Sequence, residues 1–394
     1  MKKIKVLRVV TNSSVVPWHL KNTLELHRLD ENIKVFVVGE NVEQYSNTYP
    51  HVIFINWKVE RKPNFFKDLH SLYNLIKIIF RIKPDIVHSL MPKASLLASV
   101  ASFITRVPVR IHTFTGQMWN LDLRYKKNIL YWFDRLVFNL NTICLTDSPS
   151  QSEFLLEHGF VSNTKKLECL GFGSLSGVDS SSIKYNQETV DYLKNKYSLH
   201  NKFVCLFLAR KNQEKGAFDL LEIFQDFNDG NSVLLFIGPD NSDGWLSNLR
   251  LSKPSLFNDV IELDSVTNPF DFIKCSDVLI LLSKREGFGS IVIDAASMGV
   301  PSIGTNIVGL RDAIDNGKTG ILVESNNKKQ TIDALKTLYT DTNIYRQYSR
   351  NCINRVREYF DSRLLHSELI SLYTKSLPKI SAQHYFNSSL SRKN

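Results

Sequence analysis

Short runs of apolar and β-branched residues alternate along this chain with longer segments of helical periodicity, in two successive sets. In the first set, the predicted strands are KVLRVV (5–10), IKVFVVG (33–39), VIFIN (52–56), DIVHSL (85–90), VRIHTF (109–114) and TICLTD (142–147). Helices are predicted between them at 18–29, 66–82, 94–104, 124–139 and 149–158. Because these strands lack strict polar–apolar alternation, they predict a parallel sheet that is covered by helices on both faces.

The pattern restarts after the Gly/Ser-rich segment GFGSLSG (171–177). The second set of predicted strands is FVCLFLAR (203–210), SVLLFIG (232–238), DVIELD (259–264), DVLILL (277–282), VPSIGT (300–305) and GILV (320–323). Predicted helices follow the same alternation at 187–197, 216–228, 242–251, 267–275 and 290–298, and continue at 328–339, 341–359 and 361–375. Two such sets predict an α/β chain with two Rossmann-like, doubly wound domains that face each other across a cleft.

The domain boundaries follow from this restart. We expect an N-terminal Rossmann-like domain at 1–178 and a C-terminal Rossmann-like domain at 179–358. A last helix at 359–380 is expected to pack back on the N-terminal domain, and the polar residues 381–394 to form a mobile tail.

Composition narrows the class of protein. With 394 residues, of which 43% are hydrophobic and 22% charged, the chain is globular and long enough for two domains. No apolar run approaches the roughly 18 residues needed to span a bilayer, and the basic N-terminus leads into a strand rather than a signal peptide. The five cysteines are dispersed without C-x-x-C spacing, which predicts reduced thiols in a cytoplasmic protein.

The net charge of +10 is concentrated in the first half of the chain. Residues 1–180 carry 23 basic and 15 acidic side chains (23 − 15 = +8), whereas residues 181–394 carry 26 and 24 (26 − 24 = +2). Such a surplus suggests an anionic membrane surface, an acidic ligand or nucleic acid. No RNP, helix-turn-helix or zinc-finger pattern is present, so nucleic acid is not the expected partner.

Several chemically useful side chains follow directly after predicted strands of the second half, where open parallel sheets bind ligands. Arg210 ends one strand, and Lys215 precedes the next helix, so both are placed to neutralise a diphosphate. Glu286 comes before the turn Gly287-Phe288-Gly289-Ser290, whose backbone N–H groups at a helix start suit a phosphate. Asp294 lies further along that helix. Read structurally instead, the acids are helix-start or helix-face carboxylates, and the cations are solvated surface charges.

The segment 283–323, SKREGFGSIVIDAASMGVPSIGTNIVGLRDAIDNGKTGILV, resembles the E-x7-E signature of the retaining GT-B glycosyltransferases of family 4. The similarity continues through positions that resemble the donor-side loops of that family, namely Asn306, Gly309, Asp315-Asn316-Gly317 and Gly320. LARKNQEKG is similar to the Arg…Lys-Gly phosphate element of the family, and two first-half segments, 89–119 and 171–179, resemble its capsule and O-antigen branch.

The resemblance implies that a hexose or N-acetylhexosamine moves, with retention of configuration, from a nucleotide-diphosphate sugar to a lipid-linked oligosaccharide in O-antigen or capsule synthesis. UDP-sugars are favoured as donors, with GDP-sugars left open. It implies that Arg210 and Lys215 hold the diphosphate and stabilise the leaving group. It also implies that Glu286 contacts the transferred sugar and Asp294 the ribose, without a metal. The ten histidines show no metal-ligand spacing.

The chain departs from the family pattern at two positions. The second acid of the motif is Asp294, one methylene shorter than Glu, which suits ribose binding better than proton transfer. Thr115 stands where many relatives carry a histidine, while His112 lies three residues earlier and is expected to point into the sheet. We therefore expect Thr115 and Gly116 to be cleft residues without a role in proton transfer.

Three further side chains are ambiguous in the sequence. His19 and Lys93 follow predicted strands and are candidate acceptor contacts, but a structural histidine and a simple loop cation are equally consistent with their positions. Trp119 is expected to pack at a domain edge rather than to stack on a sugar.

Two helical segments, 59–83 and 123–138, mix basic with aromatic residues. This pattern is typical of helices that lie in a membrane interface, so we expect peripheral docking on the inner face of the cytoplasmic membrane. The alternative is that both are ordinary amphipathic covers of the sheet. Two other functions also remain open: a nucleotide-sugar epimerase or phosphorylase on the same fold, and a non-catalytic basic α/β binding protein.

Overall fold

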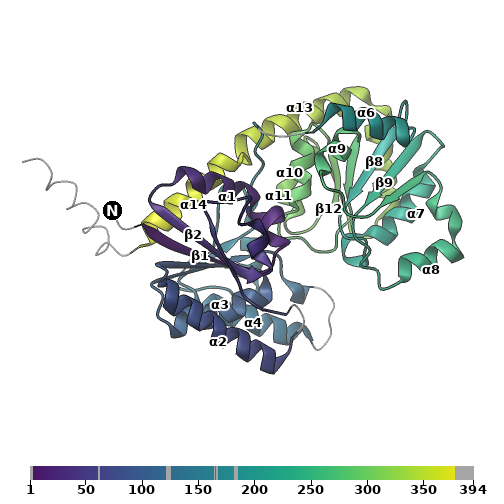
Figure 1. Cartoon of the computed structure of the whole chain (residues 1–394). Helices are drawn as coiled ribbons and strands as arrows, with labels where there is room; N and C mark the ends of the chain where they lie inside the picture. Colours follow the sequence, from purple (N-terminus) through teal and green to yellow (C-terminus); the bar gives the residue numbers. More distant parts are fainter. Residues whose placement is uncertain are drawn as a thin grey trace, which may run out of the picture. The chain divides into compact units, whose positions relative to one another are not determined.

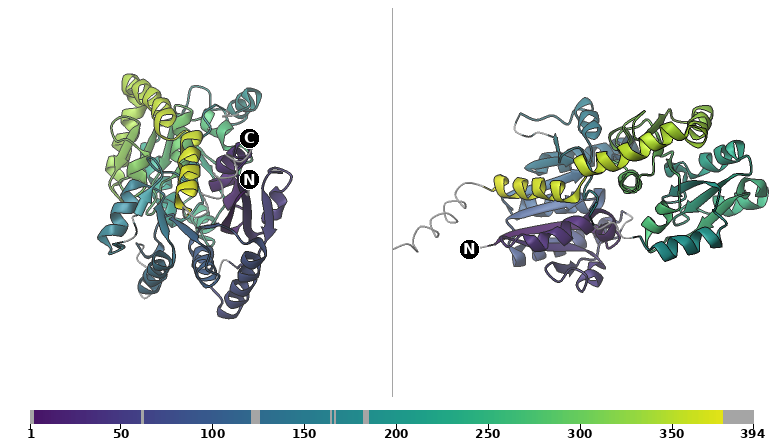
Figure 2. Two further views of the ribbon diagram at one scale, coloured as in Figure 1. Left: turned by 90° about the vertical axis from the view of Figure 1, so that its left-hand side faces the viewer. Right: turned by 90° about the horizontal axis from the view of Figure 1, so that it is seen from above.

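The computed structural model describes residues 3–60, 63–120, 126–163, 165, 167–181 and 185–377. The chain divides into two compact units, which we call the first unit (Met1–Gly177 with Ser362–Asn394) and the second unit (Val178–Asp361). The tail expected at 381–394 lies outside the described residues. Each unit is built on one parallel β-sheet with helices on both of its faces (Figures 1 and 2).

The sheet of the first unit has seven parallel strands in the order β3-β2-β1-β4-β5-β6-β7. Their bounds are β1 Ile4–Asn12, β2 Ile33–Glu40, β3 Ile53–Asn56, β4 Ile86–Leu90, β5 Val109–Phe114, β6 Ile143–Thr146 and β7 Leu167–Cys169. The first six confirm the predicted strands. The sequence did not predict β7, because three residues at a sheet edge carry too little periodicity.

The first-unit helices are α1 Lys21–Leu26, α2 Phe65–Ile82, α3 Pro92–Ile104, α4 Lys126–Leu140, α5 Pro149–Glu157 and α14 Ser362–Ser376, with short turns η1 Val16–Leu20, η2 His27–Leu29, η3 Val42–Tyr45 and η4 Met118–Asn120. The helical segment predicted at 18–29 is confirmed, although it is not one regular α-helix. That segment consists of a π turn (η1), α1 and a 3₁₀ turn (η2). Leu20 and Leu24 are buried, whereas Trp18 and Leu29 are exposed. This hydrophobic pattern does not reveal that the spacing of the backbone hydrogen bonds changes twice.

Both faces of the first-unit sheet are apolar, which explains the lack of alternation in its strands. Val6 and Val10 of β1 belong to a core that also contains Leu369 and Tyr373 of α14. Leu7 of β1 belongs to a separate core on the other face, formed with α2 and α3. Figure 1 shows α1 and α14 on one side of this sheet and α2, α3 and α4 on the other, and Figure 2 shows α14, in yellow, beside the sheet.

The sheet of the second unit has six parallel strands in the order β10-β9-β8-β11-β12-β13. Their bounds are β8 Phe203–Leu208, β9 Ser232–Ile237, β10 Val260–Leu263, β11 Val278–Leu281, β12 Ser302–Thr305 and β13 Gly320–Val323. All six confirm predicted strands. The chain order reverses between β8 and β11, which is where doubly wound sheets bind ligands.

The second-unit helices are α6 Gln187–Lys196, α7 Ala217–Phe227, α8 Trp245–Ser252, α9 Pro269–Lys274, α10 Ser290–Ser297, α11 Leu310–Ala313, α12 Lys328–Thr340 and α13 Thr342–Tyr359, with turns η5 Gln213–Lys215 and η6 Pro254–Phe257. The sequence did not predict α11, which is a single turn. Among the helices of the described ranges, none combines enough length with enough apolar character to cross a lipid bilayer. All five cysteines are free thiols, as their dispersed spacing predicted.

Candidate active site

The two loops that carry the predicted donor residues leave the second-unit sheet side by side. Strands β8 and β11 are hydrogen-bonded neighbours, with Cys205 opposite Val278. Since both strands run in the same direction, the loop 209–216 after β8 and the loop 282–289 after β11 emerge at the same edge. Residues about seventy positions apart in the sequence are thereby brought into contact.

Lys215 and Glu286 form an ion pair across these loops. The Lys215 ammonium lies 2.5 Å from Oε1 of Glu286, and the two side chains are 15% and 12% exposed. The Ser283 hydroxyl donates a second hydrogen bond of 2.7 Å to the same carboxylate oxygen. Burial alone raises the pKa of Glu286, but the Lys215 charge, these hydrogen bonds and the nearby Arg285 guanidinium outweigh it and hold the pKa below its ordinary value. Glu286 is therefore an anion at neutral pH.

A second charge cluster adjoins the first and centres on Glu214. Nη2 of Arg285 donates a 2.5 Å hydrogen bond to Oε1 of Glu214, and Nη2 of Arg210 lies 3.8 Å from Oε2 of the same carboxylate. Together with Lys215 and Glu286, the site holds three cations against two carboxylates (3 − 2 = +1). That surplus suits an anionic ligand such as a diphosphate.

Our sequence reasoning missed Glu214 and Arg285. The available signal was an acid between two cations in RKNQEKG and an arginine directly before Glu286. Charge spacing alone does not reveal which side chains pair, because the pairs join two different loops.

Backbone contacts fix the positions of the charged side chains in these loops. Gly216 adopts the left-handed conformation (φ +70°), and a Cβ at this position would lie 2.2 Å from the carbonyl oxygen of Leu282. The backbone N–H of Lys284 donates a 2.8 Å hydrogen bond to the carbonyl oxygen of Glu214. Asn212 caps η5 by accepting a hydrogen bond from the backbone N–H of Lys215. The 209–216 loop therefore lies directly against the end of β11, and only glycine allows this approach.

The turn at 287–290 leads into α10. Its N-cap residue is Gly289, so no side chain caps the first N–H groups of this helix. The Phe288 side chain is 1% exposed and packs edgewise on Phe360, so only its backbone is placed to face a ligand. The first turn of α10 contains no acidic residue, so Glu286 is not a helix-start acid that the dipole stabilises. Its partner is Lys215.

Asp294 lies one turn inside α10 and is half-buried. The resemblance places this carboxylate at a ribose. The loop after β12 packs against the 287–290 turn that precedes α10, since a Cβ on Gly309 would lie 2.6 Å from the carbonyl oxygen of Gly287. Asn306, at the start of that loop, donates a hydrogen bond to Glu324.

The candidate acceptor residues lie at one edge of the first-unit sheet. His19 follows β1, Lys93 follows β4, and Thr115 with Gly116 follows β5; these three strands are neighbours in the sheet. His19 and Thr115 are half-buried, and Gly116 is buried. Lys93 is not a loop cation. It lies in the first turn of α3, and its ammonium is 2.6 Å from the Asp68 carboxylate of α2.

His112 and Trp119 are structural residues. His112 is buried in β5, where Nδ1 lies 3.2 Å from the Ser89 hydroxyl, and burial lowers the pKa of His112 to about 3. This confirms that it points into the sheet. Trp119 is 2% exposed, its ring stacks with Phe160, and its Nε1 donates a 2.9 Å hydrogen bond to Asp134. It packs in the protein interior rather than at the domain edge that the sequence predicted.

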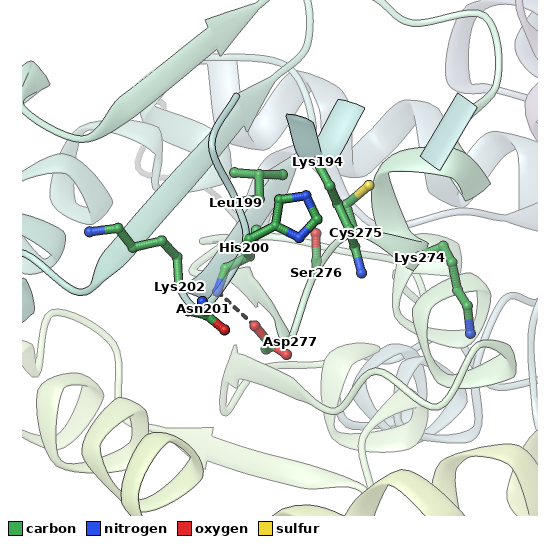
Figure 3. A pocket seen from close by; sticks show the side chains of 10 residues that line it. Lys194, Leu199, His200, Asn201, Lys202, Lys274, Cys275, Ser276 and Asp277 are labelled. Atoms are coloured by element: carbon green, nitrogen blue, oxygen red, sulfur yellow. Dashed lines mark hydrogen bonds between the residues drawn. The ribbon is translucent and has the colours of Figure 1, made fainter. Parts of the chain in front are cut away.

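The second unit has a pocket of about 210 Å³ at the other end of its sheet (Figure 3). Its lining includes Lys194, Lys202 and Lys274. Lys202 and Asp277 directly precede β8 and β11, so the pocket lies at the amino ends of the strands, opposite the Lys215–Glu286 pair. Doubly wound sheets bind their ligands at the carboxyl ends of the strands, so this pocket is not the candidate active site.

Comparison with known proteins assigns the chain to a family. Residues 191–357 match the model of glycosyl transferases group 1, and residues 5–143 match that of glycosyl transferase 4-like domains. The capsular polysaccharide biosynthesis glycosyltransferase CapM of Staphylococcus aureus is 30% identical over 385 residues, which cover 96% of this chain and 98% of that protein. The chain therefore belongs to the group 1 glycosyl transferases, the retaining family 4 of GT-B fold.

A more distant relative and a solved structure agree with this assignment. The UDP-Gal:alpha-D-GlcNAc-diphosphoundecaprenol alpha-1,3-galactosyltransferase of Escherichia coli is 26% identical over 316 residues, 76% of this chain and 78% of that enzyme. The crystal structure of Anabaena HepE in complex with UDP-glucose superposes with a TM-score of 0.79 at 14% identity, covering 94% of this chain and all of that chain. At that identity the likeness concerns the fold alone.

Proposed function

We propose that this glycosyltransferase moves a hexose or N-acetylhexosamine from a UDP-sugar to a lipid-linked oligosaccharide in the synthesis of a surface polysaccharide. The observation that carries this proposal is the charge arrangement at the carboxyl ends of β8 and β11, where Lys215, Arg210 and Arg285 surround two carboxylates. The names of the relatives support it: one is a capsular polysaccharide enzyme, and the other uses UDP-galactose and a diphosphoundecaprenol-linked acceptor.

The proposed chemistry follows from where charge develops. When the bond between the anomeric carbon and the phosphate oxygen breaks, its electron pair leaves with the nucleotide diphosphate. Fixed cations beside that oxygen stabilise the developing negative charge without reorganisation during the reaction. Arg210 and Lys215 have this role in the proposal. The acceptor oxygen bonds to the anomeric carbon on the face from which the phosphate leaves, so configuration is retained, and its proton passes to the departing phosphate oxygen.

Glu286 positions the transferred sugar in this scheme. As an anion, it accepts hydrogen bonds from sugar hydroxyls, and its ion pair holds Lys215 in place until the donor arrives. The backbone of Gly287, Phe288, Gly289 and Ser290 faces the diphosphate, and Asp294 accepts hydrogen bonds from the ribose. These roles come from the family motif together with the proximity of the loops.

The acceptor binds to the first unit in this proposal, at the sheet edge formed by the carboxyl ends of β1, β4 and β5. His19, Thr115 and Gly116 are the proposed contacts. Lys93 contributes indirectly, because its ion pair with Asp68 joins α3 to α2. His112 takes no part in proton transfer, since it is buried and neutral at physiological pH.

Membrane docking through α2 and α4 is the second part of the proposal, on the inner face of the cytoplasmic membrane. Phe65 and Phe66 at the start of α2 are 77% and 81% exposed, and Trp132 of α4 is 65% exposed. Both helices pack beside α3 on the same face of the first-unit sheet (Figure 1). Exposed Lys77 and Arg81 lie on α2 among these aromatic residues. Residues 61–62 and 123–125 of the two predicted basic segments lie outside the described residues.

Exposed aromatic groups beside basic residues suit the interface of an anionic bilayer. A lipid-linked acceptor would bring its sugar to an enzyme that is docked in this way. An ordinary sheet-covering helix keeps its largest apolar groups buried, whereas α2 and α4 expose several of theirs.

The decisive experiment supplies the purified protein with UDP-glucose, UDP-galactose, UDP-N-acetylglucosamine, UDP-N-acetylgalactosamine and GDP-mannose, with and without undecaprenyl-diphosphate-linked saccharides. We expect one UDP-sugar to release UDP and to yield a labelled lipid product with retained anomeric configuration. An epimerised donor would indicate an epimerase, and a sugar phosphate would indicate a phosphorylase. Salt-sensitive binding of nucleic acid with no affinity for any nucleotide sugar would replace the proposal with the non-catalytic alternative.

A further inference from the structure

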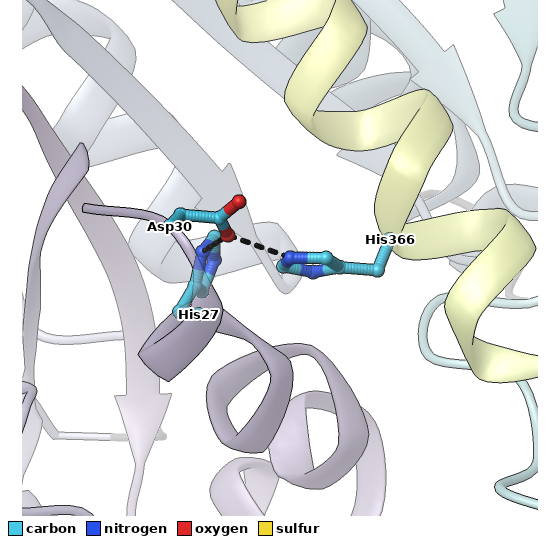
Figure 4. Close-up of side chains that lie close together, drawn as sticks. All are labelled: His27, Asp30 and His366. Atoms are coloured by element: carbon cyan, nitrogen blue, oxygen red, sulfur yellow. Dashed lines mark hydrogen bonds and ion pairs between the residues drawn. The ribbon is translucent and has the colours of Figure 1, made fainter. Parts of the chain in front are cut away.

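A buried cluster of His27, Asp30 and His366 lies in the first unit and includes none of the candidate acceptor residues (Figure 4). Oδ2 of Asp30 is 3.3 Å from Nδ1 of His27 and 2.7 Å from Nε2 of His366. The two rings meet edge to face with their centroids 4.8 Å apart. Figure 4 shows both imidazoles pointing toward the carboxylate, so three potential metal-ligand atoms converge on one point.

The fold supplies these ligand atoms from two places. His27 begins the 3₁₀ turn η2 and Asp30 follows it, and the backbone N–H of Asp30 donates to the carbonyl oxygen of His27. This turn fixes the first two side chains relative to each other. The third comes from α14, 336 residues further along the chain, which packs on the same face of the sheet. Two ligands on one tight turn and a third on a remote helix are an effective way to hold an ion.

The surroundings of the cluster favour an ion. His27 and His366 are 5% and 7% exposed, and Asp30 is half-buried. Each of the three side chains offers one ligand atom, and these atoms lie within 4.8 Å of one another.

We propose that His27 Nδ1, the Asp30 carboxylate and His366 Nε2 bind a Zn²⁺ ion, with water as the fourth ligand. Two imidazoles and one carboxylate are a donor set that Zn²⁺ accepts in tetrahedral geometry. With metal–ligand distances of about 2.0–2.1 Å, tetrahedral ligands lie about 3.3 Å apart. The His27–Asp30 separation already has this value, and the His366–Asp30 separation has to open by about 0.6 Å. The third separation, between the two histidine nitrogens, is at most 4.8 Å and has to close by up to about 1.5 Å.

The role of this ion is structural rather than catalytic. Asp30 precedes β2, so the cluster lies toward the amino ends of the first-unit strands. The candidate acceptor residues follow the carboxyl ends. A bound ion would join the N-terminal turn to the C-terminal helix and so resist the detachment of α14, whose Leu369 and Tyr373 complete the core.

The test uses the full-length protein, stripped of metal with EDTA and titrated with Zn²⁺ and with Co²⁺ as a spectroscopic probe. We expect one equivalent to bind, a visible Co²⁺ absorption band typical of tetrahedral coordination, and a rise of several degrees in the melting temperature with Zn²⁺. His27→Gln and His366→Gln should each weaken Zn²⁺ affinity at least tenfold and abolish the Co²⁺ band. His70→Gln, at an exposed position on α2, is the matched control and should bind like the parent protein.

Asp30→Asn keeps the size of the side chain while removing its charge. It serves as a further ligand variant in case a histidine variant does not fold. Circular dichroism of every metal-free variant establishes that it is folded before titration. The proposal is overturned if the parent protein shows neither the absorption band nor a Zn²⁺-dependent melting shift. It is equally overturned if the folded His27→Gln and His366→Gln variants retain both signals, because the metal would then bind elsewhere.

Discussion

The ammonium of Lys215 lies 2.5 Å from the carboxylate of Glu286, 71 residues further along the chain. This contact exists because β8 and β11 are neighbours in the sheet and because Gly216 allows its loop to touch the end of β11. A largely buried pair of this kind contributes little net stability, since desolvation offsets the attraction, but breaking it leaves an unpaired charge. In the proposed mechanism, the pair positions two groups for one ligand.

Removing either charge of this pair should reduce catalysis more than folding. We expect Lys215→Met and Glu286→Gln each to lower kcat/KM by about 100-fold or more, because each loses a preorganised interaction with the transition state. Steady-state kinetics with the identified donor measures this, with circular dichroism as the folding check. Lys284→Gln, an exposed neighbour, is the control and should retain parental kinetics. Full activity in Lys215→Met would remove this lysine from the mechanism.

Replacement of Asp294 separates ribose binding from proton transfer. If the carboxylate binds a ribose, Asp294→Asn should raise the donor KM by roughly tenfold, the effect of losing one charged hydrogen bond, with a smaller change in kcat. Asp294→Glu should keep the donor KM near the parental value, because it retains the carboxylate and reproduces the longer acid of the family motif. The reverse pattern, a collapse of kcat at unchanged KM, would assign a catalytic role to Asp294.

Gly216→Ala tests the close approach of the two loops. The added Cβ would lie 2.2 Å from the Leu282 carbonyl oxygen in a left-handed backbone, so we expect the loops to separate and activity to fall together with stability. Gly230→Ala is the matched control. It has a similar positive φ (+85°) with nothing within 4 Å, and should cost only the conformational penalty of about 1–2 kcal/mol. Equal losses of unfolding free energy in urea for both variants would contradict the steric contact.

Asp134 should make stability depend on pH in an unusual direction. Burial raises the pKa of Asp134 to about 7, opposed in part by the hydrogen bond from Trp119. Because the folded state holds this proton up to about pH 7 and the unfolded state releases it near pH 4, its contribution to stability is full below pH 4 and is lost as pH rises through 7.

Asp134→Asn removes this proton linkage. The variant should therefore gain stability relative to the parent as pH rises from 5 to 8, by about 3 kcal/mol, measured as free energy of unfolding in urea. Asp333→Asn, at an exposed position on α12, should show no such trend. A constant difference between Asp134→Asn and parent across this range would contradict the raised pKa.

Membrane docking should depend on the exposed aromatic residues of α2. We expect the double variant Phe65→Ser/Phe66→Ser to bind vesicles with 30% phosphatidylglycerol at least tenfold more weakly than the parent, since two highly exposed rings no longer enter the interface. Vesicle flotation measures the bound fraction. Leu251→Ser, at an 83% exposed position of the second unit, controls for general loss of surface hydrophobicity. Equal binding by all three proteins would exclude α2 as the docking element.

Much of the architecture was predictable from local sequence. Strands buried on both faces are continuously apolar, as in LLFI of β9, and helices between them carry one apolar stripe, so two parallel sheets follow from pattern alone. The sequence also indicated Arg210, Lys215 and Glu286, because each comes just after a strand, where such sheets bind ligands. The short elements β7 and α11 were missed because so few residues carry no periodicity.

The pairing of side chains was decided by tertiary structure. The sequence carries no sign that Arg285 pairs with Glu214, that Lys93 pairs with Asp68, or that His366 meets Asp30. These contacts depend on strand order and on where a helix crosses a sheet, which are set by the packing of the whole core rather than by local preference. Local chemistry therefore determined which residues stand at the ends of the strands, and long-range packing determined which of them meet.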